Sequence, residues 1–193
     1  MRVYQYIHQT KAEGPGNRFA IWVQGCPHKC PGCFEKDTWD SYGGFELSLE
    51  EVIGEFNKAA GFVDGVTILG GEPFEQAEEL AEFAEYVRQS GKTVITFTGY
   101  TYVSLQARSD LSVNKLLRNT DILMDGEYVQ ALRDFSRPMV GSKNQNIIFL
   151  SDRISMQEYY SYKNSIEVRM SPSGRIRING MGDLDKIRKE IGG

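Results

Sequence analysis

Three cysteines lie within eight residues of one another, and the chain contains no others. Their spacing is Cys26-x3-Cys30-x2-Cys33. Thiolates at this spacing can reach three corners of one cubane iron–sulfur cluster from a single loop, which glycine and proline help to turn tightly. Such clusters usually have four cysteine ligands, so three leave one iron open to a substrate or cofactor. The spacing therefore predicts a catalytic cluster.

Two other chemistries are open to the same cysteines. A disulfide framework is disfavoured because the count is odd and a reducing compartment keeps thiols free. A structural zinc site would need His28 as its fourth ligand, two residues from both Cys26 and Cys30. That spacing is tight for a tetrahedral site, and zinc sites more often use two separated ligand pairs. The cluster is the favoured interpretation.

A second motif, Gly70-Gly71-Glu72-Pro73, directly follows a short apolar run. Paired glycines let the backbone approach a ligand closely, and the carboxylate of Glu72 can accept a hydrogen bond from an ammonium group. The alternative is a tight turn between a strand and a helix, with a solvated acid. Its position at a strand end beside the cysteine loop favours ligand binding.

Two weaker motifs also follow apolar runs, Thr98-Gly99-Tyr100 and Asp125-Gly126. Either motif can be only a turn. The hydroxyl of Thr98 and the carboxylate of Asp125 can equally hold a cofactor or a cation at a strand end. The residues alone leave both alternatives open.

Five short apolar runs rich in Val, Ile and Phe read as buried strands. They are residues 19–23, 66–69, 94–97, 122–124 and 147–150. Helices are predicted between them, one after a Ser48/Glu51 capping box, one over 74–90 before Gly91, and one or two turns within 103–117. This alternation predicts an α/β fold with a parallel sheet. All four motifs then fall at the carboxyl ends of strands, where active sites of such folds collect.

The length, the net charge and the C-terminal sequence indicate the domain organisation and the location of the protein. With 193 residues we expect one domain, with a core of about 4–151 and a C-terminal extension of 152–193. In the extension, 165–170 and 175–179 alternate polar and apolar residues and predict a β-hairpin, followed by a short helix from Asp183. The net charge of −4 gives no reason to expect nucleic acid or a membrane surface. Without a long apolar run or a signal peptide, a cytoplasmic location is expected.

The cysteine loop together with Gly70-Gly71-Glu72-Pro73 resembles the radical S-adenosylmethionine superfamily. Within it, the chain is similar from about Tyr4 to Ser151 to the activating enzymes of anaerobic (class III) ribonucleotide reductases. The similarity runs through the following blocks, of which the last select the group: Gly14-Pro15-Gly16-Asn17-Arg18, Thr98-Gly99-Tyr100, Asp121 to Gly126, Leu132-Arg133-Asp134 and Gly141 to Gln145.

The resemblance implies a partial, open β/α barrel and a [4Fe-4S] cluster held by the three cysteines. The open iron would be chelated by the amino and carboxylate groups of S-adenosyl-L-methionine. By the same resemblance, Gly32, Phe34 and Gly71 line the cofactor, and Glu72 lies near its ammonium group. Gly70, Thr98 and Asp125 complete the expected cofactor site.

The activity implied is reductive cleavage of S-adenosylmethionine to a 5′-deoxyadenosyl radical, which makes a glycyl radical on a large anaerobic ribonucleotide reductase. The electron would come from a low-potential donor such as flavodoxin or ferredoxin. Many superfamily members have an aromatic residue where this chain has Gly32, a difference that leaves the radical chemistry intact.

Two alternatives stay open at this point. One is a radical enzyme that activates another glycyl radical enzyme or modifies a peptide or small molecule directly. The other is a non-catalytic metal-binding module.

Overall fold

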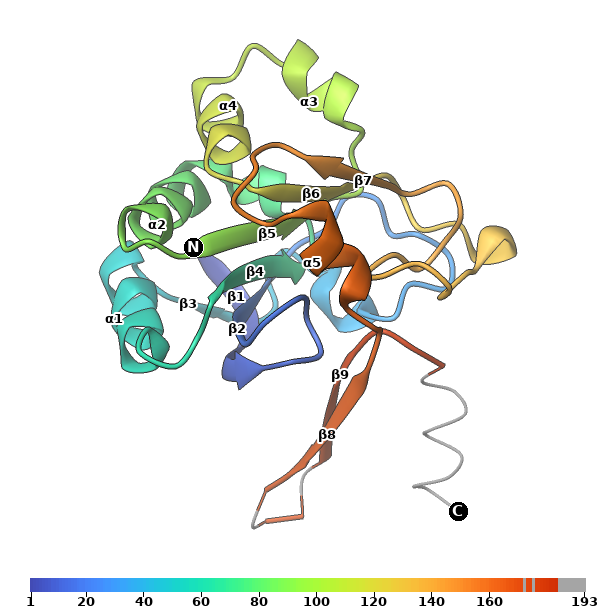
Figure 1. Cartoon of the computed structure of the whole chain (residues 1–193), viewed down its shortest axis with the longest axis horizontal. Coiled ribbons are helices and arrows are strands. Elements are labelled where there is room, and N and C mark those ends of the chain that lie inside the picture. The colour runs from blue at the N-terminus through green and yellow to red at the C-terminus, as the bar shows by residue number, and fades with distance from the viewer. Residues whose placement is uncertain (172, 175, 184–193) are drawn as a thin grey trace.

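The computed structural model describes the whole chain except residues 172, 175 and 184–193. A seven-stranded sheet runs through the body in the order β3-β1-β2-β4-β5-β6-β7 (Figure 1). Its strands are β1 (Arg2–Thr10), β2 (Arg18–Val23), β3 (Phe45–Glu46), β4 (Gly65–Gly70), β5 (Thr93–Phe97), β6 (Ile122–Asp125) and β7 (Asn146–Phe149). The helices are α1 (Leu49–Ala59), α2 (Ala77–Gln89), α3 (Tyr102–Ala107), α4 (Leu111–Arg118) and α5 (Met156–Ser161), with short 3-10 turns η1 (Lys36–Thr38), η2 (Pro73–Gln76) and η3 (Gln130–Leu132).

The four central strands, β2, β4, β5 and β6, are parallel, as the alternation of apolar runs and helices predicts. The sheet ends at β3 and β7 and does not close, so the prediction of an open α/β fold is confirmed. Among the five strands expected from apolar runs, one differs in direction. β7 pairs antiparallel with β6 because the segment between them contains only η3 and no helix to carry the chain back across the sheet.

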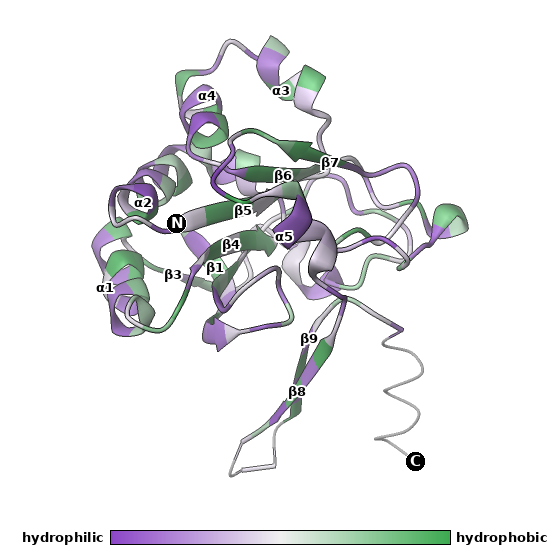
Figure 2. Cartoon of the chain, in the orientation of Figure 1, coloured by the Kyte–Doolittle hydropathy of each residue, from purple (hydrophilic) through white to green (hydrophobic). Residues whose placement is uncertain are grey.

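Both faces of the sheet are covered, and the central strands are hydrophobic along most of their length (Figure 2). On one face, α1, α2 and α4 bury alternate strand residues such as Phe19, Ile21 and Val66. On the other face, α5 and the loops around it bury Ile95 and Met124. Burial on both faces explains why these strands read as continuous apolar runs rather than alternating ones.

The predicted helix signals are present. The Ser48 hydroxyl accepts the backbone N–H of Glu51 at 3.2 Å, and the Glu51 carboxylate accepts the N–H of Ser48 at 2.7 Å, which closes the capping box of α1. α2 ends at Gln89, and Gly91 follows with a positive φ of 81°, a conformation that favours glycine.

A buried arginine joins the amino-terminal ends of three strands. Arg18, only 1% exposed, donates from its guanidinium to the hydroxyls of Thr67 and Thr93 and to the carbonyl of Val66. Burial lowers the pKa of Arg18 to about 10. A β-carbon at Gly65 would lie 2.5 Å from this guanidinium, so the neighbouring strand makes room for it.

The predicted C-terminal hairpin is formed by β8 (Ile166–Met170) and β9 (Ile176–Gly180), which project from the body in Figure 1. It is attached through polar side chains. Asn179 donates to Thr10 at 3.0 Å and to Glu13 at 3.1 Å, and the carboxylate of Glu167 accepts from Thr10 and from the N–H of Lys11. The predicted helix beyond Asp183 lies outside the described residues.

Among the described helices, none is long and apolar enough to cross a membrane.

We expect Arg18→Met to lower the free energy of unfolding by about 2 kcal/mol or more, because three buried acceptors would lose their donor. In a chain of this size that corresponds to a fall of about 5 °C in melting temperature. Arg118→Met, at an exposed position on α4, is the matched control and should melt as the wild type does. Equal melting of the two variants would contradict the role assigned to Arg18.

A second prediction concerns Glu13. Burial raises the pKa of its carboxyl group to about 8, and hydrogen bonds from the Asn179 side chain and the Gly180 amide oppose this rise. The unfolded chain loses this proton near pH 4, as an ordinary Glu does. Between about pH 4 and pH 8 the folded protein therefore holds a proton on Glu13 that the unfolded chain has lost. The free energy of unfolding falls as the pH rises towards 8. We expect the melting temperature of wild type to fall relative to Glu13→Gln between pH 5.5 and 8. Parallel curves for the two proteins would show that Glu13 is already charged when buried.

Candidate functional site

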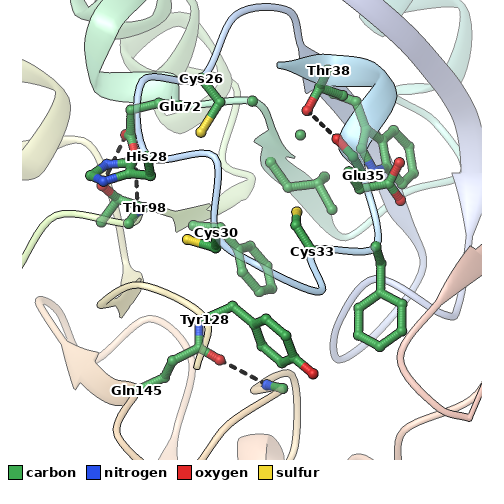
Figure 3. Close-up of a pocket in the computed structure, with 18 of the residues that line it drawn as sticks. Cys26, His28, Cys30, Cys33, Glu35, Thr38, Glu72, Thr98, Tyr128 and Gln145 are labelled. Carbon is green, nitrogen blue, oxygen red and sulfur yellow. Dashed lines mark hydrogen bonds and ion pairs between the residues drawn. The ribbon is translucent and has the colours of Figure 1, made fainter. Parts of the chain in front are cut away.

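The carboxyl ends of the central strands open into one pocket (Figure 3). Figure 3 shows the three thiols around the same space, with Glu72, His28 and Thr98 along one side of it. Of the residues expected from the sequence, the pocket is lined by Cys26, Cys30, Cys33, Phe34, Gly70, Gly71, Glu72 and Thr98. Gly32 and Asp125 are not among its lining residues.

The start of the cysteine loop is held in place by two backbone hydrogen bonds of Gly25. Gly25 donates to the carbonyl of Thr38 at 2.7 Å, and the Glu72 N–H donates to the Gly25 carbonyl at 2.8 Å. A β-carbon at Gly71 would lie 2.2 Å from that same Gly25 oxygen. The second glycine of the Gly70-Gly71-Glu72-Pro73 motif thus allows the end of β4 to pack directly against the start of the cysteine loop.

Each cysteine sulfur faces a backbone N–H donor. The amides of Lys29 and His28 face Cys26, that of Tyr128 faces Cys30, and that of Glu35 faces Cys33. Burial raises the pKa of all three thiols, and these donors partly offset the rise. Hydrogen bonds to sulfur are one means by which proteins set the reduction potential of iron–sulfur clusters. The three thiols therefore have nearby amides of the kind that cluster-bound thiolates would use.

Trp39 lies on the wall of this pocket. Its buried indole N–H makes no aligned hydrogen bond within the described chain, yet it is close enough to Cys33 to counteract the rise in the pKa of that thiol. An N–H donor without an oxygen acceptor, beside a cysteine, fits a site that holds a sulfur-rich group.

The carboxylate of Glu72 is fully buried and is held by four groups. One oxygen accepts from the Phe74 amide and the Thr98 hydroxyl, both at 2.9 Å. The other accepts from the Gly99 amide at 2.8 Å and lies 3.2 Å from His28 Nε2. Glu72 thus joins the ends of β4 and β5 to the cysteine loop.

His28 separates the thiols from a second, more exposed cavity lined by Tyr100, Ser104 and Glu127. Its Nδ1 lies 2.9 Å from Glu127 Oε1, and its Nε2 faces Glu72 within ion-pair distance but is not aligned as a hydrogen bond. Glu72 raises the pKa of His28 against the opposing effect of burial, and Glu127 adds to the rise. Because both ring nitrogens face carboxylates, His28 is not placed as a fourth zinc ligand.

The remaining strand-end motifs have structural partners. A β-carbon at Gly99 would lie 2.5 Å from the His28 ring, so the glycine makes room for the imidazole. Asp125 accepts from the Tyr102 amide and from the side chain of Asn146, each at 2.7 Å, and so joins β6 to α3 and β7. Thr98 therefore lines the pocket, whereas Asp125 does not line it and instead holds neighbouring elements together.

The two residues expected beside the third cysteine differ in their surroundings. Phe34 lines the pocket, with its ring 5.8 Å from that of Tyr128. Gly32 has φ of 79°, and a β-carbon there would lie 2.7 Å from the side chain of Gln130. Gly32 faces a neighbouring cavity that also includes Arg133.

Sequence reasoning missed several contributors to the pocket, among them Glu13, Trp39, Tyr128 and Met181. Tyr128 had a signal, since it lies three residues after Asp125 at a predicted strand end. The others come from segments whose contact with the pocket depends on the fold.

Comparison with known proteins agrees with this geometry. Residues 12–148 match the family model described as a 4Fe-4S single cluster domain. The matched region contains all three cysteines and the Gly70-Gly71-Glu72-Pro73 motif, so the chain carries an iron–sulfur cluster domain.

Several curated proteins are similar to this chain. The anaerobic ribonucleoside-triphosphate reductase-activating protein of Escherichia coli K12 is 32% identical over 152 residues, covering 75% of this chain and 96% of the relative. That of Vibrio cholerae is 30% identical over 154 residues, covering 76% and 97%. The pyruvate formate-lyase 1-activating enzyme of E. coli K12 is 32% identical over 130 residues, covering 64% of this chain and 50% of the relative. The chain therefore belongs to the 4Fe-4S single-cluster family that includes the anaerobic ribonucleoside-triphosphate reductase-activating proteins.

Proposed function

We propose that this protein makes a glycyl radical on an anaerobic ribonucleotide reductase, using S-adenosylmethionine and one [4Fe-4S] cluster. The observation that carries the proposal is the set of three thiols around one pocket at the glycine-rich strand ends. The similarity to reductase-activating proteins over nearly their whole length supports the same conclusion.

Cys26, Cys30 and Cys33 would hold the cluster and leave one iron for the cofactor. The chemistry that the bound groups supply is one-electron cleavage of the sulfonium, which gives a 5′-deoxyadenosyl radical able to take a hydrogen atom from a glycine Cα. The chain would orient these groups and exclude water from the pocket.

The cofactor would lie along the ends of β4 and β5. Gly70 and Gly71 leave the backbone accessible there, and Phe34 supplies an apolar wall. Because Glu72 and Thr98 are fixed by their mutual hydrogen bond, little ordering is needed when a ligand arrives. In this proposal Gly32 and Asp125 contribute through the segments that they support.

We also propose that residues 1–193 act as one cytoplasmic unit that receives its electron from a low-potential donor such as flavodoxin or ferredoxin. The large partner would cover the open side of the pocket during the reaction, because a primary carbon radical must be shielded from solvent.

The cluster assignment predicts about four irons per chain after anaerobic reconstitution, the number in one cubane. We expect Cys33→Ala to lose the visible absorption of the cluster and all S-adenosylmethionine cleavage, measured as 5′-deoxyadenosine released under reduction. The matched control is Thr38→Ser, which keeps a hydroxyl on the same pocket wall. Normal cleavage by Cys33→Ala would refute the ligand assignment.

The reaction itself predicts a persistent glycyl radical on the reductase of the same cell, detected by electron paramagnetic resonance. The signal should require this protein, the reductase, S-adenosylmethionine and a low-potential reductant without oxygen, and 5′-deoxyadenosine should form with it. Replacing the reductase with a pyruvate formate-lyase tests whether this protein also activates the enzyme for which its other relative, the pyruvate formate-lyase 1-activating enzyme, is named. Cofactor cleavage without a radical on the reductase would contradict the proposal and direct attention to another substrate.

A further inference from the structure

Trp39 follows the cysteine loop and is held in place through its backbone. Its carbonyl accepts the amide of Cys26 at 3.3 Å, so it is joined to the first cysteine. On either side of it, the buried side chain of Gln24 donates to the carbonyls of Asp37 and Asp40, at 3.0 and 2.6 Å. The position of Trp39 on the pocket wall is therefore set by hydrogen bonds of the folded chain.

The indole N–H of Trp39 lies beside Cys33 and has no oxygen partner in the described part of the chain. The nitrogen is buried, so solvent cannot supply an acceptor either. Its presence lowers the pKa of the Cys33 thiol against the opposing effect of burial, as a donor beside the sulfur does. A neutral thiol is a weak acceptor, whereas a thiolate accepts strongly. The donor is thus matched to Cys33 in the form that binds a metal.

This donor differs from the others around the thiols because it belongs to a side chain. The sulfur of Cys33 also faces the backbone amide of Glu35, which every residue except proline would supply at that position. The indole N–H is supplied by tryptophan alone. One substitution therefore removes it and leaves the backbone donors in place.

The pocket wall that carries Trp39 is not the wall of the proposed cofactor site. Figure 3 shows Glu35 and Thr38, the residue before Trp39, on the side of the pocket away from His28 and Thr98. The proposed cofactor position follows Thr98 and the ends of β4 and β5. An effect of Trp39 on the cysteines can therefore be measured before S-adenosylmethionine is added.

We propose that Trp39 sets the reduction potential of the cluster through a hydrogen bond from its indole N–H to the Sγ of Cys33. This inference rests on the part of the proposed function that assigns the cluster to the three cysteines. Reduction adds negative charge to the sulfurs, so a donor stabilises the reduced state more than the oxidised state. Trp39 thus raises the potential and makes the cluster easier to reduce by a low-potential donor.

The test measures the reduction potential of cluster-loaded, full-length protein without S-adenosylmethionine, by anaerobic titration followed by electron paramagnetic resonance. Trp39→Phe removes the N–H and keeps an aromatic ring. The matched control is Trp22→Phe, which changes the other of the two tryptophans in the chain, buried in β2. In the Trp22→Phe protein, benzothienylalanine supplied in place of tryptophan enters only at position 39, where it replaces the N–H with sulfur and keeps the shape of the ring.

We expect the ratio of reduced to oxidised cluster at a fixed potential to fall about tenfold in Trp39→Phe. For one electron this is a shift of about 59 mV to lower potential. The benzothienylalanine protein should shift by the same amount relative to Trp22→Phe, and Trp22→Phe itself should have the wild-type potential.

A wild-type potential in Trp39→Phe would overturn the proposal, as would an equal shift in Trp22→Phe. A benzothienylalanine protein with the potential of Trp22→Phe would also overturn it, because the shape of the ring and not its N–H would then matter. If Trp39→Phe binds no iron, the benzothienylalanine protein decides the question. Wild type that binds no iron would overturn this proposal and the proposed function together. The expected shift without a glycyl radical on the reductase would overturn the proposed function and leave the role of Trp39 intact.

Discussion

The site depends on one buried carboxylate. Glu72 is removed from solvent, and a charge in that position is stable only when hydrogen-bond donors surround it. Donors from Phe74, Thr98 and Gly99 meet it, and they belong to two different strand ends. Forming these bonds sets the distance between β4 and β5 at their carboxyl ends, and His28 extends the arrangement into the cysteine loop. The position of the cysteine loop beside β4 and β5 thus depends in part on satisfying one buried carboxylate.

The two ends of the sheet have different tasks. At the amino ends, the Arg18 guanidinium bonds to β4 and β5, and Gly65 leaves the space that it needs. At the carboxyl ends, glycines take the places where side chains would obstruct a neighbouring loop, as Gly71 does for Gly25 and Gly99 does for His28. Hydrogen bonds that stabilise the sheet lie at the amino ends of its strands, and the space for a ligand lies at the carboxyl ends. In folds of this kind the loops at the carboxyl ends can vary without loss of the sheet.

Local patterns were enough to predict most of the elements. The parallel strands follow from short apolar runs, α1 from its capping box, and the hairpin from alternation around a turn. The direction of β7 could not be predicted, because an apolar run does not reveal whether its connection crosses the sheet. The setting of His28 depends on Glu127, 99 residues away, and the inward face of the hairpin depends on Thr10, more than 150 residues from Glu167. Such pairings are properties of the tertiary fold, so no local pattern records them.

The contact between Gly32 and Gln130 has a consequence for loop engineering. A β-carbon at Gly32 would overlap the Gln130 side chain, which belongs to η3, about a hundred residues further along the chain. The cysteine loop and η3 therefore pack against each other with complementary shapes. Grafting a cysteine loop with an aromatic residue before its third cysteine would require exchange of η3 as well, and chimaeras with the other activating enzymes should take both segments from one parent.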